Sequence, residues 1–418
     1  MDDRSLIARA SRRLGFGVVG GTLESEVTAG VAAFRTKLLT PDTGGVPQAP
    51  PLWTTDATVL PDEPNTRRKE VTFAAMSEWL EHMVTSPRTH TEWLTWFWHG
   101  HFVVAQPEVR NPQFMVDNLL LLRALGAGDF ATLATEVTKD PAMLLYLDGN
   151  DNQAEAPNEN FSRELLELFT LGIGNYTEDD VDSGASALTG WKIDRNTRTT
   201  RLFSDRHDGE EQPYLGANVN DLDGVVKAVM AQPAFAPFIA GRFARQVLGP
   251  NPAADLVAAA ATAFTSSGYQ VSALIGSLAD SLLAGTDSAP LILGPVPWYI
   301  AARRATGSPV GKDVRGMLNS CGQLPWFCPS VAGWPYHDGW ATAATHVGRF
   351  NLAAVVAEQT ASDSAALTAV GADDNTALAM ALGLPTDFSE PSWAAITTMP
   401  DARGRLTLAL VSPEFVNA

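Results

Sequence analysis

The sequence lacks any long apolar run. No stretch of about 20 apolar residues, the length that crosses a bilayer as a helix, occurs among its 418 residues. Its first residues, MDDRSLIARASRRLGFG, also lack the apolar segment of a signal peptide. As it stands, the sequence predicts a cytoplasmic chain without a membrane span, and a leader removed beforehand would escape this test.

Positive charge is scarce. The chain has 29 Lys and Arg against 47 Asp and Glu, a formal net charge of −18, and no block of consecutive basic residues. A general binder of phosphate backbones needs the opposite balance, so nucleic acid is not an expected partner. The acidity predicts a solvated surface that aids solubility. A small-molecule substrate, a polymer substrate and a protein partner all stay open.

Cysteine is nearly absent, since the chain has only Cys321 and Cys328, in the segment CGQLPWFCP. The six residues between them, one a proline, do not match the short spacing of a zinc knuckle. A disulfide is one interpretation. The sequence favours the other, two buried free thiols.

Helical periodicity, by contrast, is abundant. Apolar residues make up 45% of the chain and recur at the spacing of amphipathic helices. We predict a long surface loop at 41–65 and a short β-hairpin at 192–215, where Thr, Arg and Asp alternate with apolar residues. Helices are predicted at 3–14, 22–39, 68–99 with a boundary at Ser86-Pro87, 112–125, 128–137, 140–147, 158–171, 177–189, 220–231, 233–247, 252–266, 270–283 and 290–305.

These elements predict a mainly α fold, a multi-helix globular body with a short β-hairpin insertion around 192–215. The length suits one helical domain over 1–418. An alternative is a division into two lobes, 1–190 with the motifs described below and 216–418.

The segment WFWHGHFVV places His99 and His101 two residues apart. On a helix the two side chains diverge by about 200°, so they share a ligand only if the helix ends between them. Gly100 is a plausible helix terminator, and an extended backbone would put both imidazoles on one side, as in many metal sites. The alternative is a helix C-terminus at which the histidines cap carbonyl groups and pack against tryptophans.

The helix predicted at 158–171 carries polar residues among large apolar ones. Glu164 and Glu167 follow one face with Arg163 beside them, so the two carboxylates can converge on one point. The alternative is a solvated face on which Arg163 pairs with a neighbouring glutamate. The apolar stripe of the helix predicted at 158–171, which we expect to face the core, comprises Phe161, Leu165, Leu168 and Phe169.

Two further segments offer ligands. His207-Asp208-Gly209, at the turn of the predicted hairpin, adds an imidazole and a carboxylate. The segment 148–159, DGNDNQAEAPNE, resembles a calcium loop with oxygen ligands at positions one, three, five and twelve. Its sixth residue is Gln where such loops need Gly, so a turn that caps the next helix is the favoured alternative. The four candidate calcium ligands are Asp148, Asn150, Asn152 and Glu159.

Together these segments resemble the bacterial DUF1800 family over most of the chain. The family is defined without an established activity, and many members resemble exported proteins with a leader peptide, which is not visible here. The resemblance implies that the polar residues named above, with Asn160, occupy the family's signature positions. The matching segments are SRRLGFG, FWHGHF, YLDGN, PNENFSRELLELFTLG, YTEDDV, ALTGW, HDG followed by YLG, and AGWPYHDGW with GRFN.

Our leading hypothesis from the sequence is a metal-dependent enzyme, hydrolytic or oxidative. Mixed nitrogen and oxygen ligands suit Zn, Fe or Mn. Glu167 or Asp208 would act as general base on metal-bound water, and Arg163 would orient an anionic substrate. The alternative is a non-catalytic binding or assembly protein whose polar cluster is a structural network. The candidate metal ligands are His99, His101, Glu164 and His207.

Overall fold

The computed structural model of the chain describes residues 1–40, 65–194, 197–286, 290–311 and 314–418. These residues are mainly α-helical, with two small two-stranded sheets, so the predicted fold class is confirmed. The surface loop predicted at 41–65 falls outside the described residues, apart from residue 65, which begins a helix.

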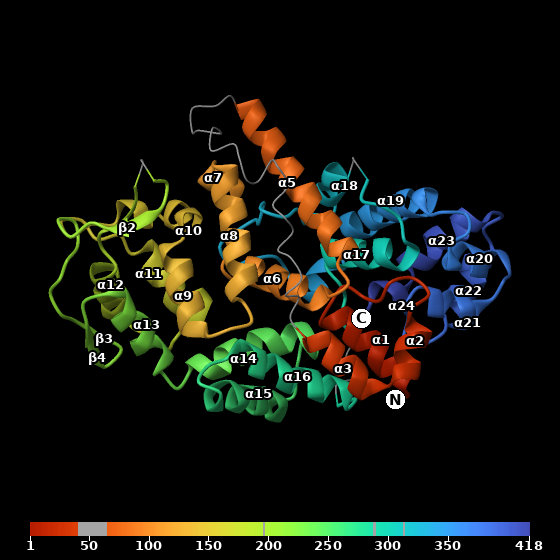
Figure 1. Cartoon of the computed structure of the whole chain (residues 1–418), viewed down its shortest axis with the longest axis horizontal. Coiled ribbons are helices and arrows are strands. Elements are labelled where there is room, and N and C mark those ends of the chain that lie inside the picture. The colour runs from red at the N-terminus through yellow and green to blue at the C-terminus, as the bar shows by residue number, and fades with distance from the viewer. Residues whose placement is uncertain (41–64, 195–196, 287–289, 312–313) are drawn as a thin grey trace.

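Three helices open the chain: α1 (Asp3–Arg13), α2 (Leu23–Ala29) and α3 (Val31–Leu39). α1 begins where the Asp2 carboxylate accepts the backbone N–H of Ser5 at 2.9 Å, a typical N-cap. α1 and α3 pack against α16 (Val271–Leu283), so the start of the chain lies beside a segment far along the sequence (Figure 1).

The centre of the molecule is built on α5 (Asn65–Thr85) and α6 (Thr89–His101), which separate at Ser86-Pro87 as predicted. α7 (Gln106–Val109) and α8 (Pro112–Leu125) follow. Almost every side chain of α6 is buried, because this aromatic-rich helix is enclosed by its neighbours on all sides.

The next group contains the helix predicted at 158–171. It is shorter than predicted and changes its winding: α11 is an α-helix, whereas η2 is a π-helix. α12 begins with a capping box, in which Thr177 and Asp180 exchange side chain–backbone hydrogen bonds. The bounds are α9 (Phe130–Lys139), α10 (Pro141–Tyr146), η1 (Gly149–Asp151), α11 (Asn160–Glu164), η2 (Leu165–Thr170) and α12 (Glu178–Ala187).

The β insertion consists of two hairpins where the sequence predicted one. β1 (Trp191–Ile193) pairs with β2 (Thr200–Leu202), and β3 (Gln212–Tyr214) pairs with β4 (Ala217–Val219). Leu215 and Gly216 join the second pair with φ of 51° and 81°, as a two-residue hairpin turn requires. The Asp180 carboxylate accepts the backbone N–H of Leu215 at 2.7 Å and fixes this turn to α12.

The remaining elements are helical. No single described helix has the length and apolarity to cross a membrane; α13 and α14 reach that criterion only as a pair, across a bend of 76°. The bounds are α13 (Leu222–Met230), α14 (Phe235–Val247), α15 (Ala254–Ser266), α17 (Pro295–Thr306), α18 (Val314–Ser320), η3 (His337–Trp340), α19 (Ala343–Gln359), α20 (Ala365–Gly371), α21 (Asn375–Ala381), α22 (Glu390–Thr397), α23 (Ala402–Val411) and α24 (Pro413–Val416).

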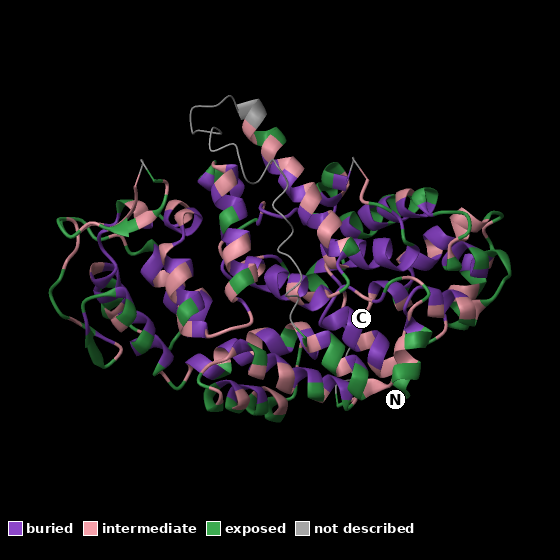
Figure 2. Cartoon of the chain, in the orientation of Figure 1, coloured by how far each residue is buried: buried purple, intermediate pink, exposed green. Residues whose placement is uncertain are grey.

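The apolar core is continuous from one end of the molecule to the other. Buried side chains from Ile7 to Ala418 form one connected cluster, and Figure 2 shows buried faces along the helices of the whole body. Helices from before residue 190 pack against helices after residue 216, for example α5 against α17. The division into two lobes stays a prediction, with substantial packing across its boundary.

Both cysteines are buried free thiols, as the sequence favoured. Burial raises the pKa of Cys321 to about 11 and that of Cys328 to about 12. A thiol with so high a pKa is almost entirely protonated at neutral pH, so neither residue is an activated nucleophile.

Candidate functional site

His99 lies fully buried on α6. Its Nε2 accepts the backbone N–H of Trp326 at 3.1 Å, and its ring packs against Trp79 and Trp334 at centroid distances of 5.5 and 5.3 Å. Burial lowers its pKa to about 3, so the ring is neutral at physiological pH. Trp326 has φ of 63°, a left-handed conformation uncommon for a large residue, and His99 stabilises it there.

His101 is 2% exposed and bonds to a different segment: its Nε2 donates to the carbonyl oxygen of Phe169 at 2.9 Å. Burial and, to a lesser extent, the charge of Arg242 lower its pKa to about 3. The expectation that Gly100 ends the helix is wrong, because α6 continues to His101 and is capped at Phe102. The two imidazoles therefore stay on a helical backbone and diverge.

These hydrogen bonds assign the tautomers of the two rings. Nε2 of His99 accepts an N–H, so its proton is on Nδ1; Nε2 of His101 donates to a carbonyl, so its lone pair is on Nδ1. Neither Nδ1 has a hydrogen-bond partner among the described residues. In this conformation the lone pair of His99 is already used by Trp326 and is not free to bind a cation.

Glu164 and Glu167 do lie near each other, on α11 and η2. Burial raises the pKa of Glu164, and the charge of Glu167 raises it further. The Glu167 carboxylate accepts the hydroxyl of Tyr176 at 2.8 Å. The two carboxylates thus interact as the spacing predicted.

The core-facing stripe of this helix differs from the prediction at one position. Phe161, Leu165 and Phe169 are buried, but Leu168 is only half-buried and Leu166 is fully buried instead. The π-helical turn accounts for the change, because it has more residues per turn than the α-helix assumed for the spacing.

Arg163 pairs with two glutamates on the surface. Its guanidinium donates to Glu178 and Glu159 at 2.8–2.9 Å, and its side chain is 33% exposed. The hydrogen bonds that Arg163 donates to Glu178 and Glu159 raise its pKa above the usual value. This arrangement matches the alternative in which Arg163 lies on a solvated face.

His207 and Asp208 lie in the connection between the two hairpins, so the prediction that they form a hairpin turn is wrong. Nδ1 of His207 bonds to the carbonyl oxygen of Thr189 at 2.9 Å, and the backbone N–H of Asp208 donates to the Thr189 hydroxyl at 2.7 Å. A Cβ at Gly190, where φ is 87°, would lie 2.8 Å from that of His207. The close approach explains the glycine in ALTGW.

Protein donors already occupy all four residues of the candidate calcium loop. The Asn150 side-chain oxygen accepts the N–H of Ile193 at 3.0 Å, and that of Asn152, which is 4% exposed, accepts the N–H of Asn158 at 2.9 Å. The Asp148 carboxylate accepts the Asn160 amide, and Glu159 accepts Arg163. Calcium would have to compete with these bonds for the same side chains.

Of the predicted site residues, the structure brings only some close together. Glu164 lies near Glu167, whereas His99, His101 and His207 each bond to a separate backbone segment. No group of three or more His, Cys, Asp or Glu side chains in the described ranges is arranged to hold a metal ion. The residues of the predicted site therefore do not fit a divalent cation in this conformation.

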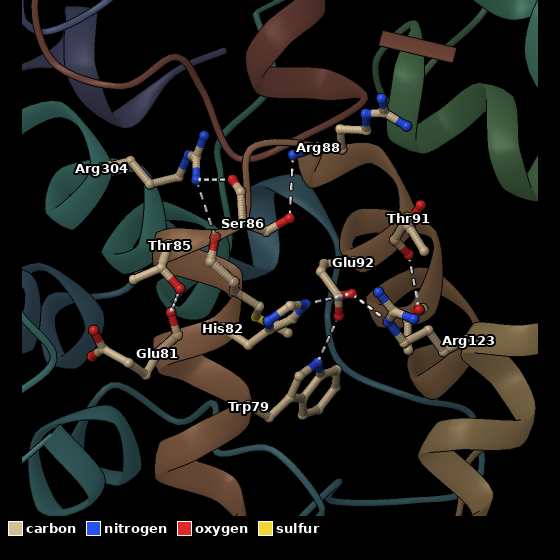
Figure 3. Close-up of polar contacts among 12 residues, drawn as sticks. Trp79, Glu81, His82, Thr85, Ser86, Arg88, Thr91, Glu92, Arg123 and Arg304 are labelled. Carbon is tan, nitrogen blue, oxygen red and sulfur yellow. Dashed lines mark hydrogen bonds and ion pairs between the residues drawn. The ribbon is translucent and has the colours of Figure 1, made fainter. Parts of the chain in front are cut away.

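Sequence reasoning missed a buried polar cluster around Glu92, which Figure 3 shows between α5, α6 and α8. Glu92 is 1% exposed and accepts Nε of Arg123 at 2.6 Å, Nε2 of His82 at 3.2 Å and Nε1 of Trp79 at 3.2 Å. Burial opposes ionisation, but the bonds and charges of His82 and Arg123 prevail and lower its pKa. The sequence feature that could have revealed this cluster is Glu92, the single carboxylate in the aromatic segment THTEWLTWFW.

Comparison with known proteins supports the resemblance drawn from the motifs. No curated protein and no solved structure matches the chain. One family model does match, and it covers residues 9–417, nearly the whole length. The chain therefore belongs to the family described as "Protein of unknown function (DUF1800)".

Proposed function

We propose that the protein is a non-catalytic binding protein in which the motif histidines hold distant segments in register. One observation carries this proposal: the two fully buried, neutral imidazoles of FWHGHF each bond to the backbone of a different segment. His99 reaches Trp326, 227 residues away in sequence, and His101 reaches Phe169. Such bonds satisfy backbone groups that would be costly to bury alone.

Other buried polar residues act in the same way. Arg304, on α17, donates to the carbonyl oxygens of Gly17, Val84 and Ser86 at 2.7–3.1 Å. Burial lowers its pKa to about 10, so it stays charged at neutral pH. It ties the loop after α1 and the end of α5 to the C-terminal half, as Figure 3 shows for Ser86.

A metal-dependent hydrolase or oxidoreductase is the second candidate. Two observations favour it: the buried, unpartnered Nδ1 lone pair of His101, and the raised pKa of Glu164 beside Glu167. It requires a rearrangement in which His99 releases Trp326 before Zn, Fe or Mn could bind. Glu167, Asp208 and Arg163 would then be available as general base and substrate-positioning groups.

A pair of substitutions at His99 separates the two functions. Gln offers an oxygen near the position of Nε2 and can accept the N–H of Trp326, whereas Leu fills the space without an acceptor. We expect His99→Leu to lower the free energy of unfolding by about 1–3 kcal/mol and His99→Gln to lower it by less, because only Leu leaves a buried N–H unpaired.

The measurements are urea denaturation and elemental analysis of the purified protein. We expect no stoichiometric Zn, Fe or Mn, and the same melting temperature with and without a chelator. One metal per chain that both His99→Gln and His99→Leu remove would establish the metal site and reject the structural role.

A further inference from the structure

Three of the motif segments meet at a pocket whose lining contains none of the predicted metal ligands or catalytic residues. The pocket encloses about 70 Å³ between α1, α6, the end of α14 and the segments 291–297 and 334–340. Arg12 and Arg13 come from SRRLGFG, Gly100 from FWHGHF, and Trp334 from AGWPYHDGW. Its lining thus joins segments far apart in sequence. Figure 1 shows α6 near the middle of the molecule, with α14 and α1 below it.

The pocket is cationic in a protein of net charge −18. Arg12 and Arg13 line it, and no Asp or Glu is among the described residues of its lining. The guanidinium of Arg13 already donates to the carbonyl oxygen of Val247 at 3.2 Å and to an oxygen of Ala418 at 2.5 Å, so the charge available to a ligand is that of Arg12. Arg12 is 3% exposed, its guanidinium donates to the carbonyl oxygen of Phe415, and it makes no ion pair with any described residue. Asp338 follows the lining residue His337, but it is 88% exposed and lies 2.9 Å from His337 Nε2.

A buried cation without a counter-ion is unfavourable, and a bound anion would compensate its charge. Two buried donors at the pocket support this conclusion: within the part of the chain that the structure describes, Nε of Arg12 and Nε1 of Trp334 have no hydrogen-bond partner. Arg242 adds positive charge next to the pocket, because its guanidinium lies 5.3 Å from the ring centroid of the lining residue Tyr336.

The other walls are aromatic. Trp96 and Trp334 stack with ring centroids 5.0 Å apart and planes 15° from parallel, and Trp93, Phe97 and Trp340 also line the pocket. Flat rings favour a planar ligand, and the volume corresponds to about five to seven water molecules, enough for a carboxylate group and the adjoining part of a ring.

We propose that this pocket binds a small planar carboxylate, with the acid group at Arg12 and the flat body against the tryptophan rings that line the pocket. The assignment deepens the proposed binding function, on which it rests, by naming the class of ligand. It does not involve His99, His101 or the carboxylates of α11 and η2.

Calorimetric titration of the full-length protein with three probes tests the proposal. We expect benzoate to bind, and benzamide and acetate to bind at least about tenfold more weakly, because one lacks the charge and the other the ring. Gln246→Glu places a carboxylate in the lining at a half-buried position and should weaken benzoate binding at least about tenfold. The matched control is Gln270→Glu, a half-buried glutamine outside the pocket, which should change it less than twofold.

Equal binding of benzoate and benzamide, equal binding by Gln246→Glu and the unchanged protein, or no benzoate binding at millimolar concentration would each overturn the assignment. These outcomes are distinguishable from failure of the proposed function, which is decided by metal content and by the His99 variants. If the protein contains no metal and does not bind benzoate, the proposed ligand class is rejected and the proposed binding function is not.

Discussion

Burial determines the ionisation of the motif histidines. His99 and His101 are enclosed by aromatic rings and bonded through Nε2, and the pKa of each is lowered to about 3 from an ordinary 6.5. In the unfolded chain both would titrate near 6.5, so folding suppresses their protonation. Their role in the folded protein is therefore that of neutral hydrogen-bonding groups.

The same shifts predict how stability depends on pH. Since the folded-state pKa is below the unfolded value, the stabilisation is fully present above pH 6.5 and is lost as the pH falls towards 3. Within that window the unfolded chain takes up a proton that the folded protein excludes. Each histidine should therefore lower the free energy of unfolding by roughly 1.4 kcal/mol for every unit by which the pH falls. Urea denaturation between pH 7 and 5 measures the slope.

The double variant His99→Gln, His101→Gln should flatten this slope, because neither replacement takes up a proton. His346→Gln changes an exposed histidine and serves as the control. A slope that stays the same in the double variant would show that other groups cause the acid sensitivity.

At the scale of elements, sequence periodicity located most helices because amphipathic spacing and capping are local properties. The boundary at Ser86-Pro87 and the start of a helix at residue 177 were predicted correctly from a few neighbouring residues. The continuation of α6 through Gly100 and the π-helical turn of η2 were not, because both depend on packing against segments distant in sequence. The neighbouring pair Glu164 and Glu167 followed from helical spacing, whereas the separate bonding of the histidines did not.

The candidate calcium loop gives a prediction at this scale. We expect millimolar calcium to leave the melting temperature unchanged, because the side-chain oxygens of Asn150 and Asn152 accept backbone N–H groups and Glu159 pairs with Arg163. Differential scanning fluorimetry with calcium, and with magnesium as a control for ionic strength, makes the measurement. A rise specific to calcium that Asp148→Ala abolishes would establish the site.

At the scale of the whole molecule, the two ends of the chain pack into one body. Residues 291 and 293 form backbone hydrogen bonds with residues 416 and 418, and α1 contributes Arg12 and Arg13 to the same region. A single continuous core joins these segments to the central helices. The pocket proposed to bind a carboxylate exists only because this closure brings α1, α6 and the 334–340 segment together.

Because the two ends of the chain pack into one body, we predict that residues 1–190 do not fold as an independent lobe. Alone they would lack α16 and α17, against which α1, α3 and α5 pack, and Trp326, which bonds to His99. They would also lack Arg304, so the carbonyl oxygens at the end of α5 would lose their donor. Circular dichroism of the fragment should show helix without a cooperative thermal transition, whereas the full chain should unfold cooperatively. A sharp transition of the fragment would establish the two-lobe division instead.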